Sequence, residues 1–139
     1  MLSRNPLEMI VRLSAPVLWA LIILWLSLIP SPPQLPGVLG WDKLLHAGSY
    51  GLLTLLIAQY LLLLSVKLGK TGWQAVLPAV CYGALLEVLQ LLMQAGRTAE
   101  WWDLAADAVG AYLAYLVFRK FSGLVCSRFP CYVRRIRSG

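Results

Sequence analysis

Residues 83–110 read GALLEVLQLLMQAGRTAEWWDLAADAVG, and they join the end of one long apolar segment to the start of the next. This span holds four acidic residues and one arginine, although only 13% of the whole chain is charged. Ionisable side chains are costly within an apolar helix and usually mark a functional site. We therefore expect any site in this protein to form around this span.

The composition of the chain is that of a membrane protein. Its 139 residues are 60% hydrophobic with a mean hydropathy of +0.73, and a soluble globule of this size could not bury so much apolar surface. The net charge of +6 fits basic loops that face anionic lipid headgroups. No basic stretch is interleaved with aromatic residues as in RNA-binding motifs. The expected partner is therefore the lipid bilayer and not a nucleic acid.

Four apolar segments approach the roughly 20 residues that span a bilayer. They predict helices over residues 13–29, 44–66, 73–94 and 103–118. We expect an uncleaved first helix, because the segment lacks a small-x-small signal-peptidase site. Pro16 and Pro78 then fall in the first turns of their helices, where proline is tolerated. The predicted fold is an all-α polytopic membrane domain of four transmembrane helices, residues 1–121, followed by a basic cytoplasmic tail, residues 122–139.

The distribution of charge predicts the orientation of these helices. Of the twelve Lys and Arg residues, two lie in the N-terminal head, two in the loop after the second helix and six in the C-terminal tail. Only Lys43 and Arg97 lie at the opposite side. The positive-inside rule therefore places both termini in the cytoplasm. Five of the six acidic residues then lie on or near the outer side.

The cysteines predict little chemistry. Cys81 lies within an apolar segment, and we expect it to be a small core residue. Cys126 and Cys131 have a spacing that matches no common zinc or redox motif.

Polar residues from three predicted helices reach a similar depth near the outer side. Residues spaced three or four apart share a helix face, and three such sets occur: Asp42, His46 and Tyr50; Glu87 and Gln90; Asp103, Asp107 and Gly110. With the helical rise of about 1.5 Å per residue, His46 and Asp107 lie about 6 Å inside the outer helix ends and Glu87 about 10 Å. Small residues at Gly110, Ala111 and Ala114 also allow a neighbouring helix to approach closely.

At this depth Glu87 either has a partner or is protonated. A carboxylate within the membrane costs about 2.5–3.5 kcal/mol on insertion scales, so Glu87 is expected to face the interior of the bundle. Arg97, His46 and Lys43 are the candidate partners, and spacing does not choose between them. Structural roles are also open to several of these residues. Asp42 and Asp103 can cap helices, and Gln90 can join two helices.

The residue types of this cluster suit two kinds of chemistry. Carboxylates beside a histidine can bind a divalent cation or perform acid–base catalysis, and the candidate catalytic residues are Glu87, Asp107 and His46. Arg97 can hold an anionic headgroup or a phosphate. The chain contains no nucleophile elbow, P-loop or HExxH motif.

Two sequence blocks resemble the VanZ-like family of small bacterial membrane proteins. The first block is Asp42-Lys43-x-x-His46-x-x-x-Tyr50. The second is Glu87-x-x-Gln90, then Arg97, then Asp103-x-x-x-Asp107-x-x-Gly110. In the family, Asn is frequent at the position of Asp107 and Asp at the position of Glu100. The resemblance implies the bacterial plasma membrane and the cell envelope, since the family is named for a protein associated with low-level teicoplanin resistance. The candidate binding residues are the nine polar and charged residues of these blocks: Asp42, Lys43, His46, Tyr50, Glu87, Gln90, Arg97, Asp103 and Asp107.

Three classes of function fit these features. The first is a non-enzymatic envelope protein that binds a lipid-linked ligand or a glycopeptide antibiotic at the outer leaflet. The second is a small membrane enzyme that acts on an envelope substrate, with or without a divalent metal ion. The third is a structural subunit of a larger membrane complex, in which the polar cluster only locks the helices together.

Overall fold

The structure is a computed structural model that describes residues 6–29, 41–63, 68–93 and 101–128. Within these ranges the chain is all-helical and has no strands. The helices are α1 (Pro6–Leu28), α2 (Trp41–Leu63), α3 (Leu68–Met93) and α4 (Trp101–Arg128). The predicted all-α class and the four helices are confirmed.

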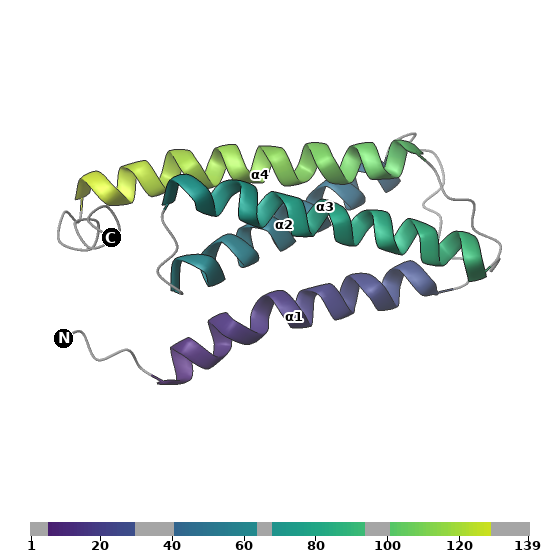
Figure 1. The fold of residues 1–139 in the computed structure, drawn as a ribbon, viewed down its shortest axis with the longest axis horizontal. Helices are drawn as coiled ribbons and strands as arrows, with labels where there is room; N and C mark the ends of the chain where they lie inside the picture. Colours follow the sequence, from purple (N-terminus) through teal and green to yellow (C-terminus); the bar gives the residue numbers. More distant parts are fainter. Residues whose placement is uncertain (1–5, 30–40, 64–67, 94–100, 129–139) are drawn as a thin grey trace.

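The four helices alternate in direction (Figure 1), so that α2 and α4 begin at the end of the bundle where α1 and α3 finish. The most extensive packing is between α2 and α4, and α3 packs on both of them. α1 packs mainly on α2. Two helices contain stretches long and apolar enough to cross a membrane, Asp42–Leu61 in α2 and Thr71–Met93 in α3.

The helices start earlier than predicted. α1 begins at Pro6 and not at residue 13, because proline is favoured at the first helical position and nothing after it breaks the helix. Pro16 therefore lies in the helix interior, as Pro78 does in α3. α2 and α4 begin at Trp41 and Trp101. This places Asp42 and Asp103 in first turns and not at the capping positions.

Two other helix ends differ from the prediction for local reasons. The predicted loop before residue 73 is helical from Leu68 onward. Gly72 is buried there, and a Cβ added to it would collide with the ring of Tyr115, so this glycine allows close packing of α3 on α4. α4 continues to Arg128 and not only to residue 118, because no proline interrupts the sequence between residue 118 and Pro130. The first part of the predicted basic tail is therefore helical.

Small side chains fill much of the interior of the bundle, beside a few larger ones such as Leu53 and Leu86, and many large apolar side chains cover its outside. Ala75, Ala79 and Ala111 are fully buried, whereas Trp25 is 66% exposed and Leu92 71% exposed. A soluble protein places its large apolar residues inside, whereas helices that pack within lipid meet through small residues. The prediction that Cys81 is a core residue is wrong, since this small side chain is exposed on α3.

Glycines bring the backbones of α2 and α4 into direct contact. A Cβ added to Gly110 would collide with backbone atoms of Ala47, and one added to Gly51 would lie 3.2 Å from the carbonyl oxygen of Gly110. The close approach predicted at Gly110 is thus observed. It holds the first turns of α2 and α4 at a fixed separation, and the polar residues lie on these turns.

Candidate functional site

His46 of α2 lies between two aspartates of α4. Its Nδ1 is 3.0 Å from Oδ1 of Asp107, a hydrogen-bond distance, and its Nε2 is 3.8 Å from Oδ2 of Asp103. The two aspartates are one helical turn apart, so both reach the same imidazole ring. The face that spacing predicted for Asp103 and Asp107 is therefore the face that meets α2.

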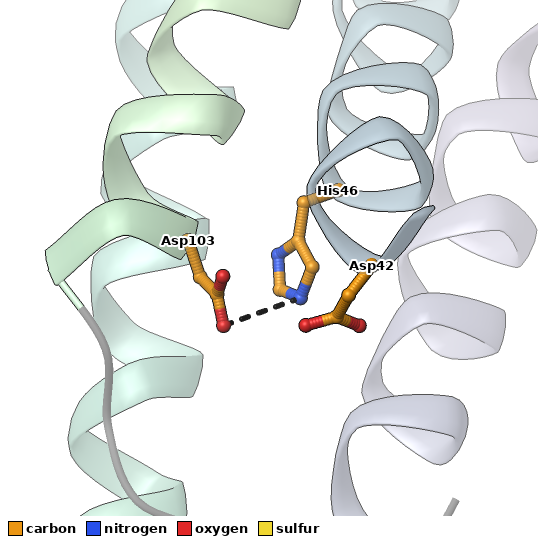
Figure 2. Close-up of side chains that lie close together, drawn as sticks. All are labelled: Asp42, His46 and Asp103. Carbon is orange, nitrogen blue, oxygen red and sulfur yellow. Dashed lines mark ion pairs between the residues drawn. The ribbon is translucent and has the colours of Figure 1, made fainter. Parts of the chain in front are cut away.

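Two further charged residues of α2 complete this group. Lys43 Nζ donates to Oδ1 of Asp103 over 3.3 Å. The carboxylate of Asp42 is exposed, one turn before His46. Figure 2 shows the imidazole edge of His46 directed between the carboxylates of Asp42 and Asp103. We call Asp42, Lys43, His46, Asp103 and Asp107 the aspartate–histidine cluster.

Asp107 is the deepest member of the cluster. Its side chain is 1% exposed, and its Oδ2 is buried with no hydrogen-bond partner among the residues that the structure describes. Gly83 of α3 lies against this oxygen: a Cβ at residue 83 would be 2.5 Å from Oδ2 of Asp107 and 3.2 Å from Cε1 of Tyr50. α3 thus closes the site from the third side, and it can do so only because residue 83 has no side chain.

Tyr50 forms the floor of the site. It is 2% exposed, and its ring stacks on that of His46 with a centroid distance of 6.4 Å and an interplanar angle of 14°. Glu87 and Asp107 are both within electrostatic range of the Tyr50 hydroxyl. The buried side of the site is therefore made of an aromatic ring and acidic side chains.

The structure does not bring all nine predicted site residues together. The cluster unites Asp42, Lys43, His46, Asp103 and Asp107, with Tyr50 beneath them. Gln90 instead donates from Nε2 to the carbonyl oxygen of Ser27 over 2.9 Å, which joins α3 to α1. Glu87 lies on α3 one turn beyond Gly83, with its Oε2 buried. Arg97 lies outside the described residues.

Sequence reasoning missed Gly83 and Ala47. Gly83 precedes Glu87 by four residues, so it lies on the polar face of α3, and this spacing was the available signal. Nothing in the sequence marked Ala47, whose backbone meets Gly110. That contact depends on the distance between two helices.

The arrangement can do two things chemically. A histidine that is hydrogen-bonded to a buried carboxylate can transfer a proton. A histidine flanked by two carboxylates can also bind a cation, and the ligand atoms of Asp42, His46 and Asp103 all lie within 4.8 Å of one another.

No curated protein and no solved structure matches this chain. A protein-family model described as VanZ/LLP1 matches residues 5–124. This match includes all four helices almost completely, together with every residue of the aspartate–histidine cluster. Because the match covers most of its length, the chain belongs to the VanZ/LLP1 family.

Proposed function

We propose that this protein is a four-span protein of the bacterial plasma membrane, with both termini in the cytoplasm. We further propose that it binds a ligand of the cell envelope, lipid-linked or glycopeptide, at the aspartate–histidine cluster. The single observation that carries the ligand site is Asp107, a carboxylate held 1% exposed among three helices of an apolar bundle. An ionisable group in such a place is costly and is usually kept for function.

The outward-facing side chains support four spans. Besides the two apolar stretches in α2 and α3, large exposed apolar residues cover the outer faces of α1 and α4, among them Leu21, Trp25, Leu113 and Val117. α1 has 23 residues and α4 has 28, and about 20 residues suffice to cross the hydrocarbon core. The helices alternate in direction, so each helix begins at the end of the bundle where the preceding one finishes (Figure 1).

The charges and tryptophans support the orientation. Trp101 and Trp102 are 86% and 72% exposed at the start of α4, where they would lie at a membrane interface. The opposite end of α4 carries Arg119 and Lys120, both exposed. The basic end belongs in the cytoplasm under the positive-inside rule, so the cluster faces the outer leaflet.

The exposure of the cluster favours a ligand that enters from the outer leaflet. Asp42 is exposed and the Lys43 side chain is 41% exposed, whereas Asp107 is buried. Solvent accessibility therefore decreases from a charged rim at Asp42 and Lys43 to a closed interior at Asp107. Such a gradient suits the polar group of an envelope lipid or of a glycopeptide.

The test is drug susceptibility at equal protein abundance. Wild type and the variants Asp107→Ala, Glu87→Gln and Arg97→Ala are expressed in a host that lacks the native protein, and membrane levels are matched. We expect wild type to raise resistance to teicoplanin and the variants to lose this effect. Gln59→Ala, at an exposed polar position of α2, is the matched control and should protect like wild type. If Asp107→Ala also protects, the cluster has only a structural role. If Glu87→Gln and Arg97→Ala protect, these two residues take no part in the effect. If wild type does not protect, the proposed link to glycopeptides is wrong.

A membrane enzyme is the second candidate, and the 3.0 Å contact between His46 and Asp107 favours it. Asp107→Asn keeps the shape and one hydrogen bond of the carboxylate but removes its basicity. An acid–base enzyme would lose its effect in cells with this variant. A binding protein would keep most of it.

A further inference from the structure

We propose that Asp42, His46 and Asp103 bind one divalent transition-metal ion, for which Zn²⁺ is the best match to the ligand types. These residues come from the first two turns of α2 and the first turn of α4, and the two helices begin at the same end of the bundle. Their ligand atoms lie within 4.8 Å of one another. The inference concerns the same cluster as the proposed function, but it does not depend on the envelope ligand.

The contact with Asp107 leaves one nitrogen of His46 available. The carboxylate of Asp107 is 3.0 Å from Nδ1. When Nδ1–H donates a hydrogen bond to this carboxylate, Nε2 carries a free lone pair. Figure 2 shows this edge of the ring directed between Asp42 and Asp103. Histidines that bind metal ions characteristically donate their other ring N–H to a carboxylate or a carbonyl, which fixes the tautomer and the ring orientation.

The burial of Asp107 is a second and independent observation. Its side chain is 1% exposed, and Oδ2 has no hydrogen-bond partner among the described residues. A neutral histidine offers this carboxylate one hydrogen bond and no charge. A cation on the far side of the ring makes the Nδ1–H a stronger donor and compensates the buried negative charge.

The charge balance of the cluster also calls for a cation. With His46 neutral, the three aspartates and Lys43 leave two negative charges uncompensated, and one divalent ion neutralises them. Lys43 does not block the site, because it contacts Oδ1 of Asp103 whereas Oδ2 faces His46.

The ligand set is suited to a tetrahedral ion with one open position. Zn²⁺ binds nitrogen and oxygen ligands at about 2.0–2.2 Å, so the three side chains must draw closer than they now lie. The exposed carboxylate of Asp42 has room to rotate for this. Three protein ligands leave the fourth position to water or to an anionic group.

The experiment uses the full chain purified in nanodiscs and stripped of metal. His46 is the single histidine in the sequence, so a streptavidin-binding tag must replace a polyhistidine tag. ¹⁵N-histidine labelling then gives one imidazole signal pair. We expect one Zn²⁺ per chain by calorimetry, with the Nε2 signal moving and Nδ1 remaining protonated. Co²⁺ should give the absorption bands of a tetrahedral site.

Variants separate ligands from the orienting residue. His46→Ala and Asp103→Asn should abolish stoichiometric binding. Asp107→Asn should weaken it by about 10–100-fold, the usual effect of losing an outer-shell partner. Glu8→Gln is the control, because Glu8 lies in the first turn of α1 at the opposite end of the bundle, and it should bind like wild type.

The proposal is overturned if wild type binds Zn²⁺ no more tightly than His46→Ala, or if the wild-type Nε2 signal does not respond to the metal. The second readout needs only the wild type and is therefore independent of how the variants fold. Stoichiometric binding without a drug phenotype supports the metal site and contradicts the envelope ligand. A drug phenotype in a protein that binds no metal supports the envelope ligand and contradicts the metal site.

Discussion

At the scale of single residues, Gly83 controls the space around Asp107. We expect Gly83→Ala to force the Asp107 carboxylate away, because the added Cβ would lie 2.5 Å from Oδ2. The loss should be about 1–3 kcal/mol of unfolding free energy, as for other overpacked sites. The His46 Nδ1 signal should shift as its hydrogen bond breaks. Unfolding in detergent and ¹⁵N-histidine NMR measure the two effects.

Gly48→Ala is the matched control for this substitution. A Cβ at residue 48 meets nothing within 4 Å, so the same chemical change should stabilise α2 by about 0.5–1 kcal/mol. If Gly83→Ala behaves like Gly48→Ala, α3 does not close the site in the way described.

The pair of His46 and Asp107 should be strongly coupled. Removing one partner of a buried pair leaves the other unsatisfied, so His46→Ala should cost about 3–5 kcal/mol of unfolding free energy. Asp107→Asn in the His46→Ala background should cost little more or restore stability. A double-mutant cycle measures the coupling, with Gln59→Ala as a neutral surface control on α2. Additive effects would show that the 3.0 Å contact contributes nothing to stability.

At the scale of helices, the α2–α4 contact depends on Gly110. Its Cβ would collide with the backbone of Ala47, and a backbone cannot move aside as a side chain can. We expect Gly110→Ala to separate the two helices, with a loss of at least about 3 kcal/mol, and Gly110→Leu to prevent folding. Membrane yield and thermal unfolding measure this. A Gly110→Ala protein as stable as wild type would mean that the two helices lie farther apart.

The helices themselves could be predicted from the sequence, but their ends could not. Apolar length predicted four helices because hydrophobic runs of this size have few other structures. Gly72 was misread as a loop residue, since a glycine that breaks a helix and a glycine that lets Tyr115 approach look identical in sequence. The role of Gln90 was likewise open until its partner, the Ser27 carbonyl, was known.

The sequence predicted which residues of the site share a helix face, but it did not predict which side chains pair with each other. Helical spacing placed Asp103 and Asp107 on one face of their helix and His46 on a face with Asp42 and Tyr50, and the structure joins these two faces. Spacing could not decide that His46 pairs with Asp107 and Lys43 with Asp103. That choice depends on the rotation and height of α2 relative to α4.

At the scale of the whole molecule, the topology is the prediction to test. In a background with the native cysteines replaced by serine, Trp101→Cys should react with a membrane-impermeant maleimide added to spheroplasts. Lys120→Cys should react only after permeabilisation, because the basic end of α4 faces the cytoplasm. Both residues are exposed on the same helix, so each is the control for the other. Reversed labelling would invert the orientation and place the cluster on the cytoplasmic side.

The backbone contact among Ala47, Gly51 and Gly110 also limits how the molecule can move. Two helices that touch through their main chains cannot slide past each other without separating, because the contact has no side chains to repack. α2 and α4 therefore move as one rigid body, and the aspartates on α4 keep their positions relative to His46. Any gating motion that admits a ligand to Asp107 must come from α3, whose Gly83 covers that carboxylate. Such a motion also strains the hydrogen bonds from Tyr82 and Gln90 of α3 to α1, because α1 packs mainly on α2.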